Sequence, residues 1–138
     1  MRIMEYKKNI HLEEKDVVDL FSSVRWRSQQ YPGDLVAGLK NSDCVFTVWK
    51  GSYLIGLINA LTDGYMIVYI HFLLVRPEYQ RQGIGTRLLD LVLEEYKHIH
   101  TKILMAYNRK VKFYKRAGFE KADFAKAMLM TDVVNMDE

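Results

Sequence analysis

Two periods of apolar residues divide this chain into helical and extended segments. Apolar residues at helical spacing predict a helix over residues 13–24 and a second, shorter helix after Pro32. The inward-facing positions are expected to be Val17, Leu20, Phe21 and Val24 in the first helix, and Leu35, Val36 and Leu39 in the second. Asp34 is expected to cap the second helix, and residues 3–7 are expected to form a short first strand.

The middle of the chain has the pattern of three consecutive strands joined by short turns. Their ranges are 44–49, 53–61 and 66–75, and the two turns contain Gly51 and Gly64. Strands joined by such short turns run antiparallel, so the three predict a meander. Residues 66–75 are apolar on both faces, which predicts a central strand covered by helices on either side.

The last third is expected to alternate helices and strands. A helix over residues 85–97 would turn an apolar stripe toward the sheet, and a strand over residues 103–106 would follow it. The stripe consists of Leu88, Leu89, Val92 and Tyr96. A helix over residues 109–117 would end at Gly118, and a last strand or hairpin is expected over residues 122–134. This order predicts the α/β (α+β) class.

Composition limits the size and setting of the protein. The 138 residues fit one domain, residues 1–138, and 49% apolar with 27% charged residues argue against disorder. No segment approaches the roughly 18 uninterrupted apolar residues of a membrane span, and no signal-peptide core follows Met1. A cytoplasmic protein that does not bind membranes is therefore expected. The single cysteine, Cys44, offers no disulfide and no metal-ligand spacing, so it is expected in the core and no metal is expected.

The most distinctive motif joins the end of the third middle strand to the next helix. Pro77 cannot donate a hydrogen bond to a sheet, and Gly83 and Gly85 allow a tight turn whose N–H groups begin the helix. Those amides and the positive end of the helix dipole favour a phosphate. A Walker loop is excluded because neither glycine is followed by Lys. A dinucleotide fingerprint is excluded because Leu88 stands where its third small residue would be.

Gln80-x-x-Gly83-x-Gly85, preceded by Val75-Arg76-Pro77-Glu78-Tyr79, resembles the pyrophosphate loop of the GNAT family of acetyl-CoA-dependent N-acetyltransferases. The order of elements also matches that family over the whole chain. The resemblance implies a single-domain acyl-CoA N-acyltransferase fold, with a mixed central sheet and helices on both faces. It further implies that strands 66–75 and 102–106 run parallel and splay apart to admit the pantetheine arm of acetyl-CoA, the co-substrate.

The resemblance assigns the cofactor contacts to three segments. The pyrophosphate is expected at the loop and helix start, formed by Arg81, Gln82, Gly83, Ile84, Gly85 and Thr86. The backbone of Leu74, Val75 and Arg76 is expected to pair with pantetheine, and a strand N–H near Leu74 to polarise the thioester carbonyl. Asn108 begins the second cofactor motif, although it precedes Tyr114 by six positions where the family commonly has seven, so its role stays open.

Three side chains are candidates for proton transfer. The pairs Phe113-Tyr114 and Gly118-Phe119 match the family's second motif, which makes Tyr114 the candidate acid for the departing thiolate. A phenol of reference pKa about 10 facing a thiol of about 8.5 is expected to supply that proton. His71 and Tyr69 alternate onto one face of a strand segment, 65–77, that lacks any carboxylate. His71 is the candidate base for the acceptor ammonium, with solvent as the alternative.

The remaining expectations concern partners. Five of the eight residues from 109 to 116 are basic, which fits a solvated helix face or the cofactor's 3′-phosphate better than nucleic acid. Trp26, Tyr31 and the region 123–128 are expected to shape the acceptor site, and the two aromatics favour a small, partly apolar amine. Transfer is expected to be direct because Cys44 is poorly placed for a covalent intermediate. Two alternatives to this function stay open: protein lysine or N-terminal acetylation, and a catalytically silent CoA-binding module. A homodimer also stays open.

Overall fold

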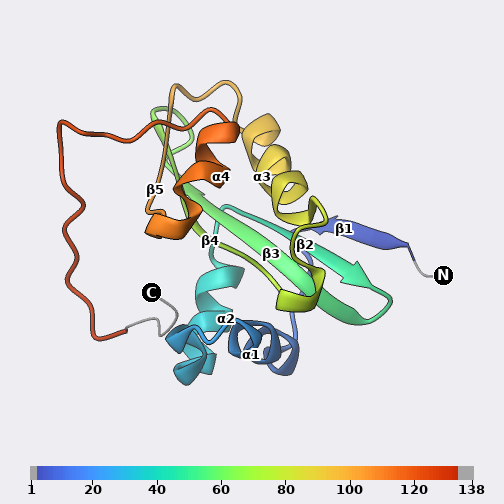
Figure 1. Ribbon diagram of the computed structural model, residues 1–138. Coiled ribbons are helices and arrows are strands. Elements are labelled where there is room, and N and C mark those ends of the chain that lie inside the picture. Colours follow the sequence, from blue (N-terminus) through green and yellow to red (C-terminus); the bar gives the residue numbers. More distant parts are fainter. Residues whose placement is uncertain (1–2, 134–138) are drawn as a thin grey trace.

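The strands form one five-stranded sheet in the order β1-β2-β3-β4-β5. The computed structural model describes residues 3–133 and is drawn in Figure 1. The strands are β1 (Met4–Lys8), β2 (Cys44–Lys50), β3 (Tyr53–Thr62), β4 (Ile67–Val75) and β5 (Thr101–Leu104). Neighbours from β1 to β4 pair antiparallel, and β4 pairs with β5 in parallel. The predicted meander and the mixed sheet are therefore confirmed.

Helices cover both faces of this sheet (Figure 1). The α-helices are α1 (Glu14–Ser23), α2 (Pro32–Lys40), α3 (Ile84–Glu95) and α4 (Val111–Arg116). Three short 3-10 helices are η1 (Arg27–Gln30), η2 (Pro77–Tyr79) and η3 (Asn108–Lys110). One core cluster joins α3 to one face of the sheet, with α4 packed against it, and the other joins α1 and α2 to the opposite face. None of the helices within residues 3–133 has the length and apolar content that a membrane-spanning helix needs.

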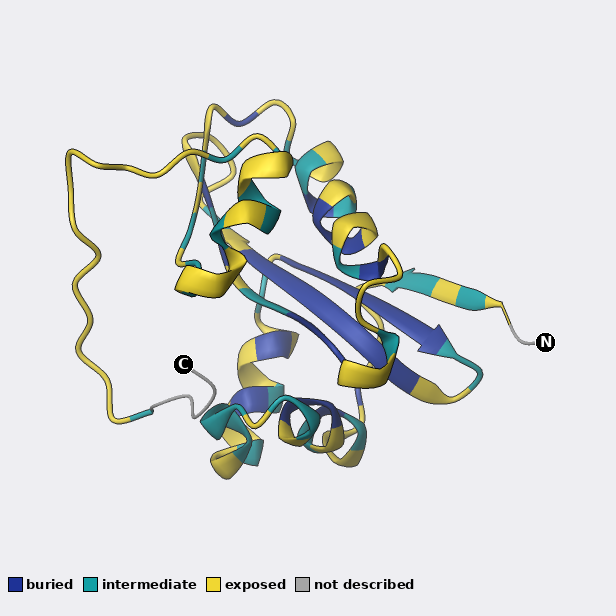
Figure 2. Ribbon diagram, viewed as in Figure 1, coloured by how far each residue is buried: buried dark blue, intermediate teal, exposed yellow. Residues whose placement is uncertain are grey.

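The central strand covered on both faces is β3, where residues 54–60 are all buried (Figure 2). The prediction that β4 holds this position is wrong, because β4 alternates between buried and accessible residues and His71 is exposed. Its outer neighbour β5 pairs only with Ile67 to Ile70, so the rest of β4 lies at the margin of the sheet.

Helix ends differ from the predictions where the backbone uses another residue. Tyr31 occupies the N-cap of α2 and Pro32 its first turn, so Asp34 lies inside the helix and does not cap it. The predicted helix 109–117 is divided into η3 and α4. Its predicted end at Gly118 is confirmed: Gly118 has φ +105°, and the N–H groups of Gly118 and Phe119 donate to the carbonyls of Lys115 and Tyr114.

The predicted last strand is absent from residues 122–133, which run as an exposed, unpaired segment (Figures 1 and 2); residue 134 lies outside the described residues. The segment contains Phe124, which is 93% exposed, and three alanines, which favour strands weakly. A strand needs a partner to pair its backbone. Whether a partner is within reach depends on the whole fold and is invisible in a local pattern.

Candidate active site

The pairing between β4 and β5 ends long before β4 does. The parallel register runs from Ile67 opposite Thr101 to Ile70 opposite Leu104, whereas β4 continues to Val75. Over residues 71–75, β4 therefore pairs only with β3. The backbone side of residues 71–75 that faces away from β3 is called the open edge of β4 below.

The hydrogen bonds to β3 determine which amides face the open edge. Arg76 N–H donates to the Ile55 carbonyl at 2.9 Å, and Phe72 N–H donates to Asn59 Oδ1 at 2.7 Å. Because N–H directions alternate along an antiparallel strand, Leu74 N–H also points toward β3. The amides directed to the open edge are those of Leu73 and Val75. The expected polarising N–H near Leu74 would therefore be that of Leu73 or Val75.

A β-bulge controls the side chains at this point. Ala60 lies opposite Ile70 and Ile58 opposite Leu73, so Asn59 faces both His71 and Phe72. The extra residue turns two successive side chains to the same face, and their rings stack with centroids 3.9 Å apart. Sequence spacing alone predicted strict alternation and missed this change of direction.

His71 is held by rings and lies at an accessible surface. The Tyr69 ring is 5.8 Å from His71, and Phe72 packs at 4.9 Å on Phe21 and at 5.8 Å on Trp26. Desolvation lowers the pKa of His71 below its usual 6.5. The imidazole is therefore neutral at neutral pH and can accept a proton. Tyr69 lies within the paired part of β4, where burial raises its pKa.

The loop after β4 is held in a conformation that needs its special residues. Gln80 Nε2 donates to the Val75 carbonyl at 2.8 Å, which fixes the turn to the end of the strand. Arg81 and Gly83 have φ of +64° and +83°. Gly83 is the N-cap of α3, and a Cβ placed there would meet nothing within 4 Å. Glycine is therefore favoured at position 83 by backbone conformation and not by lack of space.

The first amides of α3 are directed out of the helix. Arg87 N–H makes the first helical bond, to the Gly83 carbonyl at 3.0 Å, so the amides of Ile84, Gly85 and Thr86 have no acceptor within the helix. The helix dipole places partial positive charge at the same point. Gly85 lies close to two other elements, since a Cβ there would approach the Phe113 ring at 3.5 Å and the Val75 side chain at 3.9 Å. The start of α3 is thus packed beside both β4 and α4.

Arg76 turns its side chain into the protein. Its Nε donates to the Leu54 carbonyl and its guanidinium pairs with Asp19, both at 2.6 Å, while the Tyr53 ring lies 4.0 Å away. This arrangement ties α1 to the ends of β3 and β4. Any contact of Arg76 with a cofactor would therefore come from its backbone. Nothing in the sequence indicates this role for Asp19, because Asp19 lies 57 positions from Arg76 and no local pattern connects the two.

Tyr114 packs on the sheet face opposite His71. Its ring lies 5.0 Å from Phe113 and 5.9 Å from Phe119, and it contacts the core cluster that contains α3. Burial raises its pKa to about 12. The expected proton transfer from Tyr114 to the thiolate is unfavourable and not favourable, because a phenol with a higher pKa than the thiol holds its proton more tightly. A protonated phenol of this kind is instead a hydrogen-bond donor at every physiological pH.

Asn108 and the basic side chains near it are exposed. Asn108 begins η3, whereas α4 begins at Val111, so Asn108 does not open the helix that carries Tyr114. The five basic residues of the segment, Arg109, Lys110, Lys112, Lys115 and Arg116, are all exposed. Cys44 is fully buried, and desolvation raises the pKa of its thiol to about 11. A thiol in that state does not act as a nucleophile at neutral pH.

A cavity of about 560 Å³ lies on the His71 side of the sheet. Its walls come from α2, β3 and β4 and include Tyr31, His71 and Phe72. Of the residues expected to shape the acceptor site, Tyr31 lines this cavity, whereas Trp26 and residues 123–128 do not. Two carboxylates that the sequence analysis did not assign to the site, Asp34 and Asp132, are in the lining.

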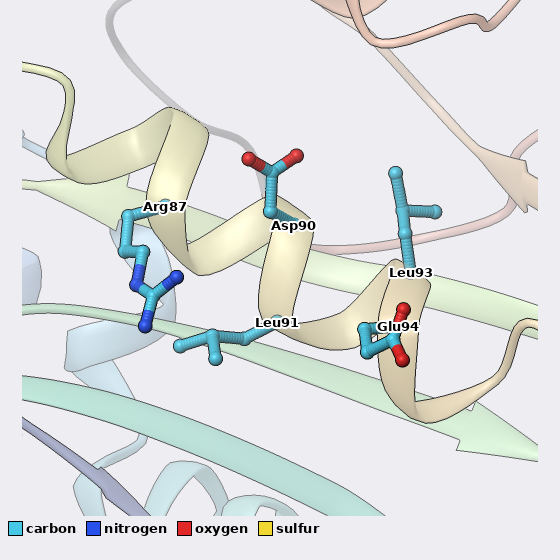
Figure 3. A pocket seen from close by; sticks show the side chains of 5 residues that line it. All are labelled: Arg87, Asp90, Leu91, Leu93 and Glu94. Atoms are coloured by element: carbon cyan, nitrogen blue, oxygen red, sulfur yellow. The ribbon is translucent and has the colours of Figure 1, made fainter.

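A second hollow lies on α3, and its side chains do not converge on one point as those of a binding site would. It is lined by Arg87, Asp90, Leu91, Leu93 and Glu94, which come from one helix and point in different directions (Figure 3). The guanidinium of Arg87 lies 5.7 Å from the Tyr6 ring. Within residues 3–133, no group of His, Cys, Asp or Glu side chains is arranged to hold a metal ion.

Comparison with known proteins finds the same fold. An acetyltransferase of Streptococcus pneumoniae TIGR4 matches with TM-score 0.80 and 28% identity over 94% of this chain and 98% of that one. A predicted acetyltransferase of Clostridium acetobutylicum, crystallised with acetyl-CoA, has TM-score 0.67 and 21% identity over 92% and 96% of the two chains.

Sequence comparison adds a curated relative and a family match. An uncharacterized N-acetyltransferase of Gracilaria tenuistipitata var. liui is 28% identical over 117 residues, which are 80% of this chain and 64% of the relative. This chain thus spans less than two thirds of that relative's length. The model of the acetyltransferase (GNAT) family matches residues 10–119. The chain belongs to the GNAT acetyltransferase family.

Proposed function

We propose that this protein is an N-acetyltransferase that transfers the acetyl group of acetyl-CoA directly to a primary amine of a small molecule. The observation that carries the proposal is the juxtaposition at the end of β4. The open edge leads through the fixed turn at Gln80 to the outward-directed amides of Ile84, Gly85 and Thr86. Family membership is consistent with this assignment.

The residues of this region fit a long ligand with a pyrophosphate at one end. The amides of residues 82–86 suit the pyrophosphate, because the loop and the helix start supply N–H donors and positive potential. The amide of Val75 suits an extended, amide-containing arm, in the manner of an added strand, and leaves the Leu73 amide for the thioester carbonyl. Acetyl-CoA has both parts and supplies an acetyl thioester that an amine can attack.

Three groups of the chain act on the transfer. The Leu73 N–H donates to the thioester carbonyl and stabilises the negative charge that develops on its oxygen. The Tyr114 hydroxyl donates a hydrogen bond to the departing sulfur and keeps its own proton. The thiolate takes up the second proton of the amine nitrogen, which is lost as the C–S bond breaks and the amide forms. His71, neutral at neutral pH, accepts the proton that an ammonium with a pKa near 10.4 must lose, directly or through a water.

The burial of Cys44 supports direct transfer over an acetylated enzyme. The competing proposal, a CoA-binding module without catalysis, draws on the absence of a carboxylate from residues 65–77. Against the silent module stands His71, which lies in the same strand and can serve as the base in place of a carboxylate. Stacking on Phe72 holds its ring, and its lowered pKa keeps it unprotonated at neutral pH.

The experiment is a product assay with acetyl-CoA and a panel of primary amines. Free thiol and acetylated amine should appear in equal amounts, measured by thiol titration and mass spectrometry. Thiol release that does not depend on the amine would contradict acetyl transfer, and no release at all with tight acetyl-CoA binding would favour the silent module. Acetylation of lysine peptides with no small amine accepted would favour a protein substrate.

A further inference from the structure

The Trp26 ring bridges the two strands whose separation leaves β4 with an open edge. It lies 5.8 Å from the Phe72 ring, on β4, and 6.2 Å from the Tyr107 ring, three residues after the end of β5. The pairing of β4 with β5 stops at Ile70 and Leu104, so both contacts lie where the strands no longer pair. Trp26 packs with Phe72 in the core cluster of α1 and α2. The indole therefore spans the gap between the two strands on the α1 side of the sheet.

The backbone before Trp26 has a conformation that most side chains avoid. Arg25 has φ +63°, and its N–H donates to the Ser22 carbonyl at 3.0 Å. The Trp26 N–H donates to the Phe21 carbonyl at 3.1 Å, which completes a Schellman motif with arginine at the position where glycine is usual. The Phe21 ring also packs on the indole at 5.8 Å. The end of α1 thus fixes the backbone of Trp26, and three neighbouring rings fix its side chain.

Trp26, Phe72 and Tyr107 together are called the aromatic wall below. Each of the three side chains is half-buried, so part of their surface stays accessible. Phe72 directly precedes Leu73, whose N–H points to the open edge. The aromatic wall therefore begins one residue from the amide proposed to hold the thioester oxygen.

The shape of a thioester directs its acyl chain toward the aromatic wall. The thioester carbon is planar, so the oxygen, the sulfur and the acyl chain leave it in three different directions. The oxygen faces the Leu73 N–H, and the sulfur faces Tyr114, which packs on the α3 side of the sheet. The third direction leads to the opposite side, where Trp26 packs on Phe72.

We propose that Trp26, held by Phe72 and Tyr107, limits the acyl group that this protein transfers to acetyl. This inference rests on the proposed transfer from a CoA thioester. A methyl group fits against a fixed ring, whereas each further methylene has to displace an indole that is packed on three other rings. The proposal assigns Trp26 to the acyl donor, in place of the acceptor contact expected from the sequence.

The kinetic test compares acetyl-, propionyl- and butyryl-CoA with one amine that the wild type accepts. In the wild type, kcat/KM should fall about tenfold or more with the first added methylene and further with the second. Trp26→Ala should bring the three donors within about threefold of one another, because it opens space beyond the acetyl methyl. Trp26→Phe should admit propionyl-CoA and still reject butyryl-CoA, since the smaller ring opens less space.

The matched pair of variants is Tyr107→Ala and Tyr6→Ala. Tyr107→Ala removes one of the rings that hold the indole and should weaken the discrimination against propionyl-CoA about three- to tenfold. Tyr6 is also a half-buried tyrosine, but it lies on β1, at the other end of the sheet order, and outside the aromatic wall. Tyr6→Ala should keep the acyl discrimination of the wild type.

Isothermal titration calorimetry without an amine measures the same limit independently of turnover. In the wild type, the Kd for butyryl-CoA should exceed the Kd for acetyl-CoA about tenfold or more, and in Trp26→Ala the two should agree within about threefold. The Kd for CoA, which has no acyl group, should be the same in both proteins. Circular dichroism melting checks that each variant is folded.

The outcomes separate this inference from the proposed function. Equal use of the three donors by the wild type, or an equal loss with all three in Trp26→Ala, would refute the acyl limit and leave acetyl transfer standing. A change in Tyr6→Ala as large as that in Tyr107→Ala would also refute it. If Trp26→Ala does not fold, unchanged discrimination in Trp26→Phe refutes the limit. If no amine is acylated with any donor, the proposed function fails, and calorimetry alone then decides whether the aromatic wall excludes longer acyl chains.

Discussion

The conformation of Gly83 provides a quantitative prediction for the cofactor loop. Gly83 has φ +83°, and a β-branched residue in that conformation costs about 1–3 kcal/mol. For 138 residues, an unfolding entropy of about 2.1 cal/mol/K per residue gives about 0.29 kcal/mol/K, so 1 kcal/mol shifts Tm by about 3.5 °C. Gly83→Val should therefore lower Tm by about 3–10 °C without ligand.

Gly83→Val should also weaken acetyl-CoA binding, and this effect can be measured separately from the loss of stability. At 100 times Kd, a ligand that binds only the native state adds about 2.7 kcal/mol, or about 9 °C in the wild type. Gly83→Val moves the N-cap and the amides that follow it. If Kd rises 100-fold, the same ligand concentration adds only about 0.4 kcal/mol, or between 1 and 2 °C.

Gly64→Val is the matched control. Gly64 lies in the turn between β3 and β4 with φ +85°, and a Cβ there also meets nothing within 4 Å. It should lose a similar amount of stability and keep the full rise of about 9 °C with acetyl-CoA. Differential scanning fluorimetry measures both values. Equal ligand-induced rises in the two variants would refute the placement of the pyrophosphate at Gly83.

The remaining predictions concern single side chains. Tyr114→Phe keeps the ring packing and removes the hydroxyl, so kcat should fall about 10-fold to 100-fold with the acetyl-CoA Kd unchanged; an unaltered kcat would reduce Tyr114 to a packing residue. Because the pKa of His71 is lowered, kcat/KM in the wild type should fall only as pH drops below about 6.5, and His71→Gln should lower the rate and abolish that inflection in a pH profile; an identical profile in the variant assigns proton removal to solvent. Asp19→Asn should lower the free energy of unfolding by about 1–2 kcal/mol in urea titrations, because it weakens the pairing of the buried Arg76 guanidinium; no change relative to Asp16→Asn would show that the pair contributes nothing.

Features set by neighbouring residues could be predicted from the sequence. The stripe of Val17, Leu20 and Phe21 is buried as expected, because helical spacing brings these side chains to one face. The helix that follows Gly83 begins within one residue of its predicted start. The end of the last helix at Gly118 is also local, since it depends on a single positive φ.

Features that join distant segments could not be predicted in this way. The bulge at His71 and Phe72 depends on Asn59, and the burial of the Arg76 side chain depends on Asp19. The cavity beside His71 joins Asp34 to Asp132, which are nearly one hundred positions apart. The missing last strand has the same explanation, because the partner for residues 122–133 is a matter of tertiary arrangement. In each case the structure depends on contacts between distant segments, which the local spacing of apolar residues does not specify.

The central claim is that a CoA ligand binds along the open edge of β4 and at the start of α3. Amide chemical shifts of the ¹⁵N-labelled protein, followed during titration with CoA, test it residue by residue. The amides of Leu73, Val75, Gly85 and Thr86 should shift strongly and gain protection from hydrogen exchange, while Leu74, already directed to β3, and Gly64, in a distant turn, should change little. Saturable shifts confined to α3 residues such as Asp90 and Glu94, or equal changes at Leu73 and Leu74, would contradict the account.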